Sequence, residues 1–409
     1  MWKPSERASH WLERVKHFMR EHITPFEAEY QQWNRKTNHH ENWQSWQIHP
    51  HVAELKQQAK AEGLWNFFLP DETFGKGLST SAYAHLAEQM GRSFLAPEIF
   101  NCNAPDTGNM EVLHYFGSDK QKKKWLVPLL EGRIRSVFAM TEPAVASSDA
   151  TNMETRIVAD GDDVVIDGCK WWTTGLGHPE AQVAIVMGLS DPEAPRHERH
   201  SMVLVPLDTP GVTIERMLPV FSEYDAPYGH GQVRFDQVRV PKENVIQALG
   251  AGFAIAQGRL GPGRVHHCMR ALGAAELALE LLIQRSQERI AFGQPLLQLG
   301  DNGSRIARHR MAIDQARLYT LHTAALIDEA GARGAASEIA GIKVVVPNVL
   351  QAVVDDAIQI HGGAGLSNDH PLTGLFALAR ALRLADGPDE VHEATVLRQE
   401  LRKYTGGAV

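Results

Sequence analysis

An acidic residue stands directly before a Gly-Pro pair near the end of the sequence, in the run from Arg383 to Glu390. The proline, Pro388, suits the first turn of a helix, where its missing N–H costs nothing. Gly387 would let another molecule approach the backbone closely. Asp386 would then present its carboxylate at a rigid corner, which is what a general base requires. An aspartate here could also be an ordinary helix N-cap, so its assignment depends on the rest of the chain.

Two segments near the middle of the chain have the composition of a surface that binds something flat and polar. Residues 138–149 are rich in small and hydroxyl side chains, which leave backbone N–H and C=O groups accessible. Residues 170–175 read Lys-Trp-Trp-Thr-Thr-Gly, and adjacent side chains on a strand point to opposite faces. One tryptophan can therefore pack in the core while Trp172 covers a ring system, with Thr174 on the same face as Trp172. The alternatives are a linking loop and ordinary aromatic packing in a sheet.

Two segments in the last third of the chain could contact phosphates. Arg289 lies where a helix is expected to end, and an arginine can bind a phosphate through two hydrogen bonds. Gln359 is followed by Gly362 and Gly363, which would let a phosphate approach the backbone. The same residues could simply end two helices. No Gly-x-Gly-x-x-Gly follows a strand and no Walker A motif occurs, which argues against Rossmann and P-loop sites.

Composition narrows the class of protein. The 409 residues are 43% hydrophobic and 22% charged, as in a soluble globular protein of two or three domains. A formal net charge of -8 argues against non-specific nucleic-acid binding. The three cysteines lie far apart and the 20 histidines show no metal-ligand spacing, so we expect neither a disulfide framework nor a metal site. The N-terminal residues do not resemble a signal peptide and no apolar run looks long enough to span a bilayer, so we expect a cytoplasmic protein.

The elements that must position these residues fall into three stretches. Residues 1–137 and 246–409 show the spacing of amphipathic helices. Residues 138–245 contain short β-branched runs separated by turns, with a hairpin signal at Asp160-Gly161. We therefore predict an α+β multidomain fold with an N-terminal α-helical domain, a middle antiparallel β domain and a C-terminal helical domain.

Taken together, these segments resemble the acyl-CoA dehydrogenase family. The TEP-x(4)-SD loop at 141–149, KWWTTG at 170–175, RxxFG at 289–293, QxxGGxG at 359–365 and the acid-Gly pair at 386–387 follow one another in family order. The likeness covers nearly the whole chain. It implies an acyl-CoA dehydrogenase-like fold whose C-terminal part is a four-helix bundle. It also implies an FAD cofactor, an acyl-CoA substrate, an electron-transfer flavoprotein as electron acceptor, and assembly into homodimers or homotetramers.

The resemblance also implies roles for individual residues. The reaction would be α,β-dehydrogenation of an acyl-CoA thioester to a trans-2-enoyl-CoA. Asp386 falls where many members carry the catalytic glutamate, which takes the α-proton while the β-hydrogen leaves as hydride to flavin N5. The residues implied for cofactor contact are Met140, Thr141, Trp172, Thr174, Arg289, Gln359, Gly362 and Gly363. Those implied for acyl-CoA contact are Ser148, Arg264, Gly387 and Arg398.

Several residues depart from the family pattern. Asp386 is one methylene shorter than glutamate, so the backbone or the substrate must shift to bring the α-proton within roughly 3 Å of the base. Pro388 and Glu390 replace the usual threonine and glutamine, which puts flavin contacts there in doubt. Residues 261–263, where some members place the base, contain no carboxylate, which strengthens the case for Asp386. The run from Asp386 to His392 is similar to the subgroup that also forms the C-terminal part of fusions with kinase-like domains.

Two alternative functions use the same residues differently. A nitroalkane oxidase-like enzyme would use the aspartate base on a small neutral acid without CoA, whereas Arg264 and Arg398 favour CoA. A flavin-free scaffold or binding protein would leave Asp386 as a helix N-cap. The substrate's chain length and branching do not follow from these residues.

Overall fold

The computed structural model of the protein describes residues 3–405, and the chain divides into two compact units. Unit 1 gathers Met1–Pro25, Gly77–Pro97 and Gly261–Val409. Unit 2 gathers Phe26–Lys76 and Glu98–Leu260. Each unit is therefore built from segments that are far apart in the sequence.

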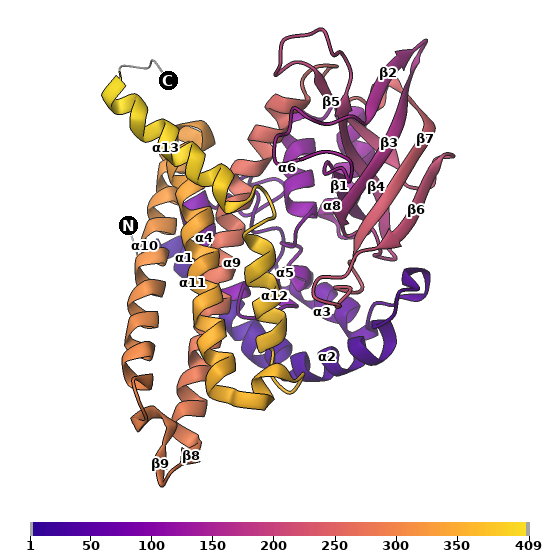
Figure 1. The fold of residues 1–409 in the computed structure, drawn as a ribbon. Helices are drawn as coiled ribbons and strands as arrows, with labels where there is room; N and C mark the ends of the chain where they lie inside the picture. Colours follow the sequence, from indigo (N-terminus) through magenta and orange to yellow (C-terminus); the bar gives the residue numbers. More distant parts are fainter. Residues whose placement is uncertain (1–2, 406–409) are drawn as a thin grey trace. The chain divides into compact units, whose positions relative to one another are not determined.

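Unit 1 is helical. Its helices are α1 (Glu6–Phe18), a π-helical turn (Met19–Ile23), α4 (Thr80–Met90), α9 (Gly252–Glu288, whose first residues belong to unit 2), α10 (Asn302–Gly334), α11 (Ala336–His361), a 3-10 turn (Gly362–Leu366), α12 (Leu372–Leu382) and α13 (Asp389–Thr405). A short hairpin follows α9; its two strands, β8 (Ile290–Ala291) and β9 (Gln294–Pro295), have two residues each. Helix α11 packs against α10, α12 and α13, and α4 packs against α1 and α10 (Figure 1).

Helix α11 is a long apolar helix in the core of this unit. Its buried stripe includes Ile339, Ile342, Val346, Leu350 and Val353, whose spacing of three and four residues puts them on one helix face. By length and composition the segment Ala336–Leu366 could also cross a bilayer, which the sequence analysis did not anticipate. Half of its most apolar window is buried inside the protein, as in a core helix.

Unit 2 combines short helices with one mixed sheet. Its helices are α2 (Thr24–Asn38, whose first residues belong to unit 1), a 3-10 turn (Trp43–Ser45), α3 (Pro50–Ala61), α5 (Ala96–Ile99, which begins in unit 1), α6 (Asp106–Phe116), α7 (Asp119–Gln121), a π-helical turn (Lys122–Leu126), α8 (Val127–Leu130) and a 3-10 turn (Lys242–Asn244). Its strands are β1 (Arg135–Ala139), β2 (Arg156–Asp160), β3 (Asp163–Thr174), β4 (Ala181–Leu189), β5 (His200–Pro206), β6 (Val212–Met217) and β7 (His230–Pro241). The sheet order is β1-β4-β2-β3-β7-β6, with β5 paired to β4.

The predicted fold class is confirmed, with one refinement in the sheet. The hairpin signal is correct, since Asp160 pairs with Asp163 across a two-residue turn in which Gly161 has φ +60°. Most strand pairs are antiparallel, but β1 runs parallel to β4. The long connection from β1 to β4, which includes the β2–β3 hairpin, leaves room for the crossover that a parallel pair requires. The core of the sheet includes Val164, Val186 and Val203, all buried.

Candidate functional site

The turn that carries Asp386 connects α12 to α13 in an unusual backbone conformation. Asp386 has φ +56° and Gly387 has φ +104°, both in the left-handed half of conformational space. Helix α13 begins at Asp389, and the Pro388 carbonyl accepts its first hydrogen bonds. The N-cap interpretation of Asp386 is therefore wrong, because Asp386 lies too far before the helix to cap it.

Donors from three helices hold the carbonyl groups of this turn. The Asp386 carbonyl accepts from Arg264 Nε (3.2 Å) and Nη2 (3.0 Å), on α9, and from His392 Nε2 (3.2 Å), on α13. Lys343 Nζ, on α11, donates to the carbonyls of Leu382 (2.5 Å) and Ala385 (3.0 Å). These bonds satisfy carbonyl groups that the end of α12 would otherwise leave unpaired. A non-glycine residue with positive φ is thereby held in place.

The groups that hold the turn are largely removed from water. Burial lowers the pKa of the Lys343 ammonium and of the Arg264 guanidinium, although the nearby Asp386 carboxylate opposes the shift of both. Burial, and then the charges of Arg264 and Lys343, lowers the pKa of His392 to about 4. His392 is therefore neutral at pH 7 and contributes one directed N–H.

A second set of bonds fixes the start of α13. The Asp389 carboxylate accepts from Arg383 Nε at 2.7 Å and from Asn348 Nδ2 at 3.1 Å. The Asp389 N–H donates to the Arg383 carbonyl at 3.2 Å. An added Cβ on Gly387 would lie 3.0 Å from His392 Nε2, so the site requires glycine for both its φ and its space.

The Asp386 carboxylate itself lies beside a histidine. Its Oδ2 is 3.5 Å from His267 Nε2, on α9, and the two side chains are 25% and 28% exposed. Asp386 therefore combines a fixed backbone with a carboxylate that is partly exposed. That is the geometry a general base needs.

The residues predicted to contact phosphates gather at one end of unit 1. Arg289 directly follows α9, and its carbonyl accepts from Leu296 N–H at 2.9 Å. Leu296 in turn lines an open hollow of about 530 Å³ together with Gln359 and Arg305. Gly362, with φ +63°, ends α11, and added Cβ atoms on Gly362 and Gly363 would meet nothing within 4 Å. A ligand could therefore approach this backbone closely.

This end of unit 1 is remote from the Asp386 turn. Lys343, which holds that turn, and Gln359 both lie on α11. At about 1.5 Å per residue, Gln359 is roughly 24 Å farther along the helix. Two separate groups of predicted site residues thus lie on unit 1.

In unit 2, a buried ion pair organises the loop after β1. Lys170 Nζ donates to the Met140 carbonyl at 2.8 Å and to Glu142 Oε1 at 2.7 Å, and both charged side chains are at most 3% exposed. Burial lowers the pKa of Lys170 to about 8. Burial would raise the pKa of Glu142, but Lys170 and the backbone N–H groups of Glu154 and Thr155 outweigh it and lower that pKa.

The loop and the tryptophan strand meet at this ion pair. Trp171 N–H donates to the Thr141 carbonyl at 2.9 Å. The strand alternation used in the prediction is interrupted, because Trp172 has φ +51° and the register shifts between Lys170 and Thr173. The bulge leaves the Trp172 side chain 41% exposed.

Trp172 and Thr174 are nonetheless neighbours. Thr174 Oγ1 lies 3.0 Å from His230 Nδ1, and the His230 ring lies 5.8 Å from the Trp172 ring. Among the described residues, the buried Trp171 Nε1 has no hydrogen-bond partner. An exposed indole, a hydroxyl group and an orphaned donor fit the edge of a polar ring system.

Ser148 and Arg398 are less closely tied to these groups. Ser148 is exposed on the loop after β1, where the adjacent Ser147 accepts the Glu142 N–H at 2.8 Å. Arg398 is exposed in the middle of α13. Their contact with an acyl-CoA remains a prediction.

Several residues that contact the predicted site residues were not identified from the sequence. They are Glu142, Lys170, His267, Lys343, Arg383, Asp389 and His392. The positions of two lysines could have indicated such partners. Lys343 interrupts an apolar helix face and Lys170 stands beside two tryptophans. A lysine buried in such surroundings without a partner would be energetically costly. The partners of these residues depend on long-range contacts, so the pairs themselves were not predictable.

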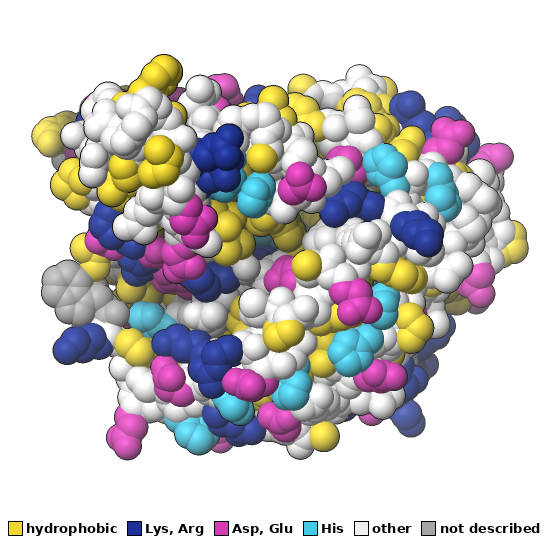
Figure 2. All heavy atoms as spheres, turned by 90° about the horizontal axis from the view of Figure 1, so that it is seen from below, with side chains coloured by type: hydrophobic (Ala, Val, Ile, Leu, Met, Phe, Trp, Pro, Cys, Tyr) yellow, Lys and Arg dark blue, Asp and Glu magenta, His cyan; other side chains and the backbone are white. Residues whose placement is uncertain are grey.

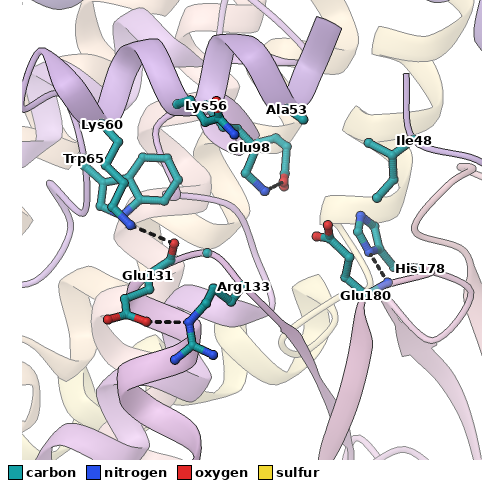
Figure 3. A pocket seen from close by; sticks show the side chains of 12 residues that line it. Ile48, Ala53, Lys56, Lys60, Trp65, Glu98, Glu131, Arg133, His178 and Glu180 are labelled. Atoms are coloured by element: carbon teal, nitrogen blue, oxygen red, sulfur yellow. Dashed lines mark hydrogen bonds and ion pairs between the residues drawn. The ribbon is translucent and has the colours of Figure 1, made fainter. Parts of the chain in front are cut away.

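A separate pocket of about 320 Å³ lies within unit 2 (Figure 3). Its charges are largely paired: Lys56 with Glu98 at 2.8 Å, and Arg133 with Glu131 at 2.5 Å. Burial, and then the Arg135 guanidinium, lowers the pKa of His178 to about 3. None of the residues predicted to contact flavin or acyl-CoA lines this pocket.

Three family profiles match consecutive parts of the chain. The N-terminal, middle and C-terminal domains of acyl-CoA dehydrogenases match residues 5–133, 137–238 and 250–401. This chain belongs to the acyl-CoA dehydrogenase family. The family assignment made from the motifs is therefore confirmed, while the subgroup with an aspartate base remains a hypothesis.

Relatives of this acyl-CoA dehydrogenase family member cover nearly all of the chain. It is 53% identical over 398 residues to mouse acyl-CoA dehydrogenase family member 10, covering 96% of this chain and 37% of that protein. FadE2 of Mycobacterium tuberculosis is 50% identical over 400 residues, which is 98% of this chain and 96% of FadE2. A solved structure of a Mycobacterium abscessus protein assigned to the acyl-CoA dehydrogenases has 57% identity and a TM-score of 0.96, and covers 98% of this chain and 100% of that one. The chain spans about half or less of the length of the family member 10 and 11 relatives.

Proposed function

We propose that this protein is a flavin-dependent dehydrogenase that forms a trans-2-enoyl-CoA from an acyl-CoA thioester. The observation that carries the proposal is the Asp386 turn, whose backbone is fixed by donors from three helices while its carboxylate stays accessible. A carboxylate on a firmly held backbone is more than an ordinary surface turn requires and suits a general base. We infer the class of reaction from the family to which the chain belongs, and the residue that acts as base from the geometry of the turn.

Asp386 would take the α-proton from the thioester. Arg264 and His392 hold its carbonyl, and Lys343 holds the carbonyls just before it, so the carboxylate pivots only about its own side-chain bonds. Fixing a catalytic group in this way reduces the entropy lost in reaching the transition state. Aspartate is shorter than glutamate, so this fixed position, and not side-chain reach, must bring it to the substrate.

The residues of unit 2 fit a flavin ring. The half-exposed Trp172, the Thr174 hydroxyl group and the Met140–Thr141 backbone would contact the ring, and the buried Lys170–Glu142 pair keeps that backbone in place. When bound, FAD would accept the β-hydrogen as hydride. Arg289, Gln359, Gly362 and Gly363 would contact its phosphates or adenosine. The family resemblance implies that Arg289 would reach the cofactor of a neighbouring subunit, in a homodimer or homotetramer.

Several further properties belong to the same proposal. The electrons would pass to an electron-transfer flavoprotein, and the protein would act in the cytoplasm, in fatty-acid β-oxidation. Ser148, Arg264, Gly387 and Arg398 would contact the acyl-CoA. Figure 2 shows basic and acidic side chains interspersed on one face of the molecule. For a chain of net charge -8 we propose no role in nucleic-acid binding.

The proposal is tested by anaerobic bleaching of the flavin with acyl-CoA thioesters. We expect the purified protein to be yellow, and its flavin absorbance to fall on mixing with at least one saturated acyl-CoA of a panel that varies in chain length, branching and hydroxylation. Nitroethane serves as the comparison substrate for the nitroalkane oxidase alternative, and we expect it to leave the flavin oxidised. A colourless protein that cannot be reconstituted with FAD would refute the proposal.

A further inference from the structure

Helix α9 places a histidine against the carboxylate of the proposed base. His267 Nε2 lies 3.5 Å from Asp386 Oδ2, and Arg264, one helical turn earlier, holds the carbonyl of the same aspartate. One face of α9 therefore contacts Asp386 twice, once through its backbone and once through its side chain. No part of the proposed reaction described so far uses His267.

The other ring nitrogen of His267 is occupied by an arginine. Arg270 Nη2 lies 3.2 Å from His267 Nδ1. A guanidinium group has five N–H donors and no acceptor, so His267 Nδ1 must be the acceptor of this bond. The neutral imidazole then carries its hydrogen on Nε2, the ring nitrogen that lies 3.5 Å from Asp386 Oδ2.

We propose that His267 is a positioning residue for the Asp386 base, donating its Nε2–H to the carboxylate in the tautomer that Arg270 selects. The inference rests on the proposed function, because it assigns His267 to the base of that reaction. A donor to a carboxylate stabilises its ionised form and restricts its rotation. Since an aspartate has little reach, restricting its rotation matters more here than it would for a glutamate.

The same tautomer excludes a different role. When the α-proton leaves its carbon, the new O–H bond forms on Asp386, and His267 Nε2 cannot take that proton because it already carries one. Moving hydrogen to Nδ1 would break the Arg270 bond and place an N–H against a guanidinium group. His267 therefore acts as a hydrogen-bond donor to the base and not as a relay for its proton.

The charges around the carboxylate come from each helix packed on the turn. Arg264 and Arg270 lie on α9, Lys343 lies on α11 and His392 lies on α13. His392 is neutral near pH 7, since its pKa is lowered to about 4 by burial. Arg270 contacts the Nδ1 side of the His267 ring and Asp386 lies on the Nε2 side, so the tautomer with hydrogen on Nε2 suits both neighbours without a charge on His267.

The decisive experiment compares two substitutions with different hydrogen-bonding capacity. In His267→Gln the side-chain oxygen can accept from Arg270 while the side-chain amide donates to Asp386. His267→Leu removes both interactions. The acidic limb of the pH profile of anaerobic flavin reduction by an acyl-CoA is measured for both, with His322→Leu, an exposed histidine of α10, as the matched control.

We expect the acidic limb to stay in place for His267→Gln and His322→Leu, and to move to higher pH by about one unit for His267→Leu. That shift corresponds to roughly a tenfold loss of rate at a fixed pH on the limb. An unmoved limb in His267→Leu, or an equal shift in both His267 variants, would overturn the proposal. If the leucine variant does not fold, Arg270→Met is measured in its place. Loss of the Arg270 donor to His267 Nδ1 should move the acidic limb to higher pH by a smaller amount. An unmoved limb in this variant would count against the proposal.

A second measurement needs no turnover. In protein labelled with ¹⁵N-histidine, the His267 signals, assigned by their loss in His267→Gln, should show a protonated Nε2 and an unprotonated Nδ1 at pH 7. The opposite tautomer would overturn the inference even if the flavin is reduced normally. Conversely, wild-type protein that no acyl-CoA reduces would refute the proposed function, while leaving this tautomer measurable.

Discussion

Replacing one partner of the Lys170–Glu142 ion pair should lower the free energy of unfolding by an amount that depends on how the other partner is buried and hydrogen-bonded. Lys170→Met keeps the length of the side chain and removes its charge. Glu142 would then remain buried with only the N–H groups of Glu154 (2.7 Å) and Thr155 (3.0 Å) as donors. Removing one partner of a buried ion pair costs about 3–5 kcal/mol. Because two donors remain, we expect a loss of about 3 kcal/mol in the free energy of unfolding.

A double-mutant cycle separates the pair from its surroundings. Glu142→Gln leaves an uncharged acceptor beside Lys170, and the double variant Lys170→Met with Glu142→Gln leaves no buried charge. Residues in direct contact typically couple by about 0.5–3 kcal/mol. We therefore expect the double variant to be less destabilised than the sum of the single variants by at least about 1.5 kcal/mol. Urea unfolding followed by circular dichroism gives each free energy.

The same substitution should affect the cofactor. Lys170 also holds the Met140 carbonyl at 2.8 Å, so its loss should loosen the loop proposed to contact the flavin. We expect the purified Lys170→Met protein to carry less FAD than wild type, as measured by the ratio of flavin to protein absorbance. A stability loss below about 1 kcal/mol, or strictly additive effects in the cycle, would refute the view that this pair is a coupled structural unit.

Two further predictions concern the Asp386 turn. Gly387→Ala should lower the free energy of unfolding by about 1–3 kcal/mol, because alanine is strained at φ +104° and its Cβ would meet His392; Gly263→Ala, where an added Cβ meets nothing within 4 Å, is the control and should cost little. If the two alanine variants melt alike, the turn is not conformationally strained. His392→Gln should flatten the pH dependence of stability between about pH 6.5 and pH 4. The pKa of His392 is about 4 in the folded protein and has the ordinary histidine value of 6.5 in the unfolded chain, so the unfolded chain binds the proton first as the pH falls. The wild type therefore loses stability as the pH falls through this window. Unfolding free energies measured at intervals across it should converge for the two proteins at low pH, and parallel curves would contradict the assignment.

The order of elements was predictable because their signals are local. The helix from Ala336 to His361, the strand from Val212 to Met217 and the turn at Gly161 follow from periodicity and turn chemistry. The family assignment also followed from short motifs in register. The parallel pairing of β1 with β4 could not be predicted from the sequence, because pairing of strands across such a long connection depends on long-range contacts.

The sequence was sufficient to select Asp386 as a candidate base, but it did not show which groups hold the backbone of that residue. Asp386 can be identified from the Gly-Pro pair that follows it, but its positive φ, uncommon for a non-glycine residue, is sustained by Arg264, Lys343 and His392 from separate helices. Trp172 was correctly placed on a strand, while the bulge that exposes it arises from the register of β3 against β7. In both places backbone geometry set by long-range contacts departs from what the local sequence favours.

Asp386 is proposed to take the α-proton, and one substitution tests this role most directly. Asp386→Asn keeps the shape of the side chain and removes its basicity. In stopped-flow mixing under anaerobic conditions with the acyl-CoA that bleaches wild type fastest, we expect the variant to retain its FAD but to reduce it roughly a thousandfold more slowly, within the range that general bases contribute. Flavin reduction at a rate close to that of wild type would show that the proton leaves by another route.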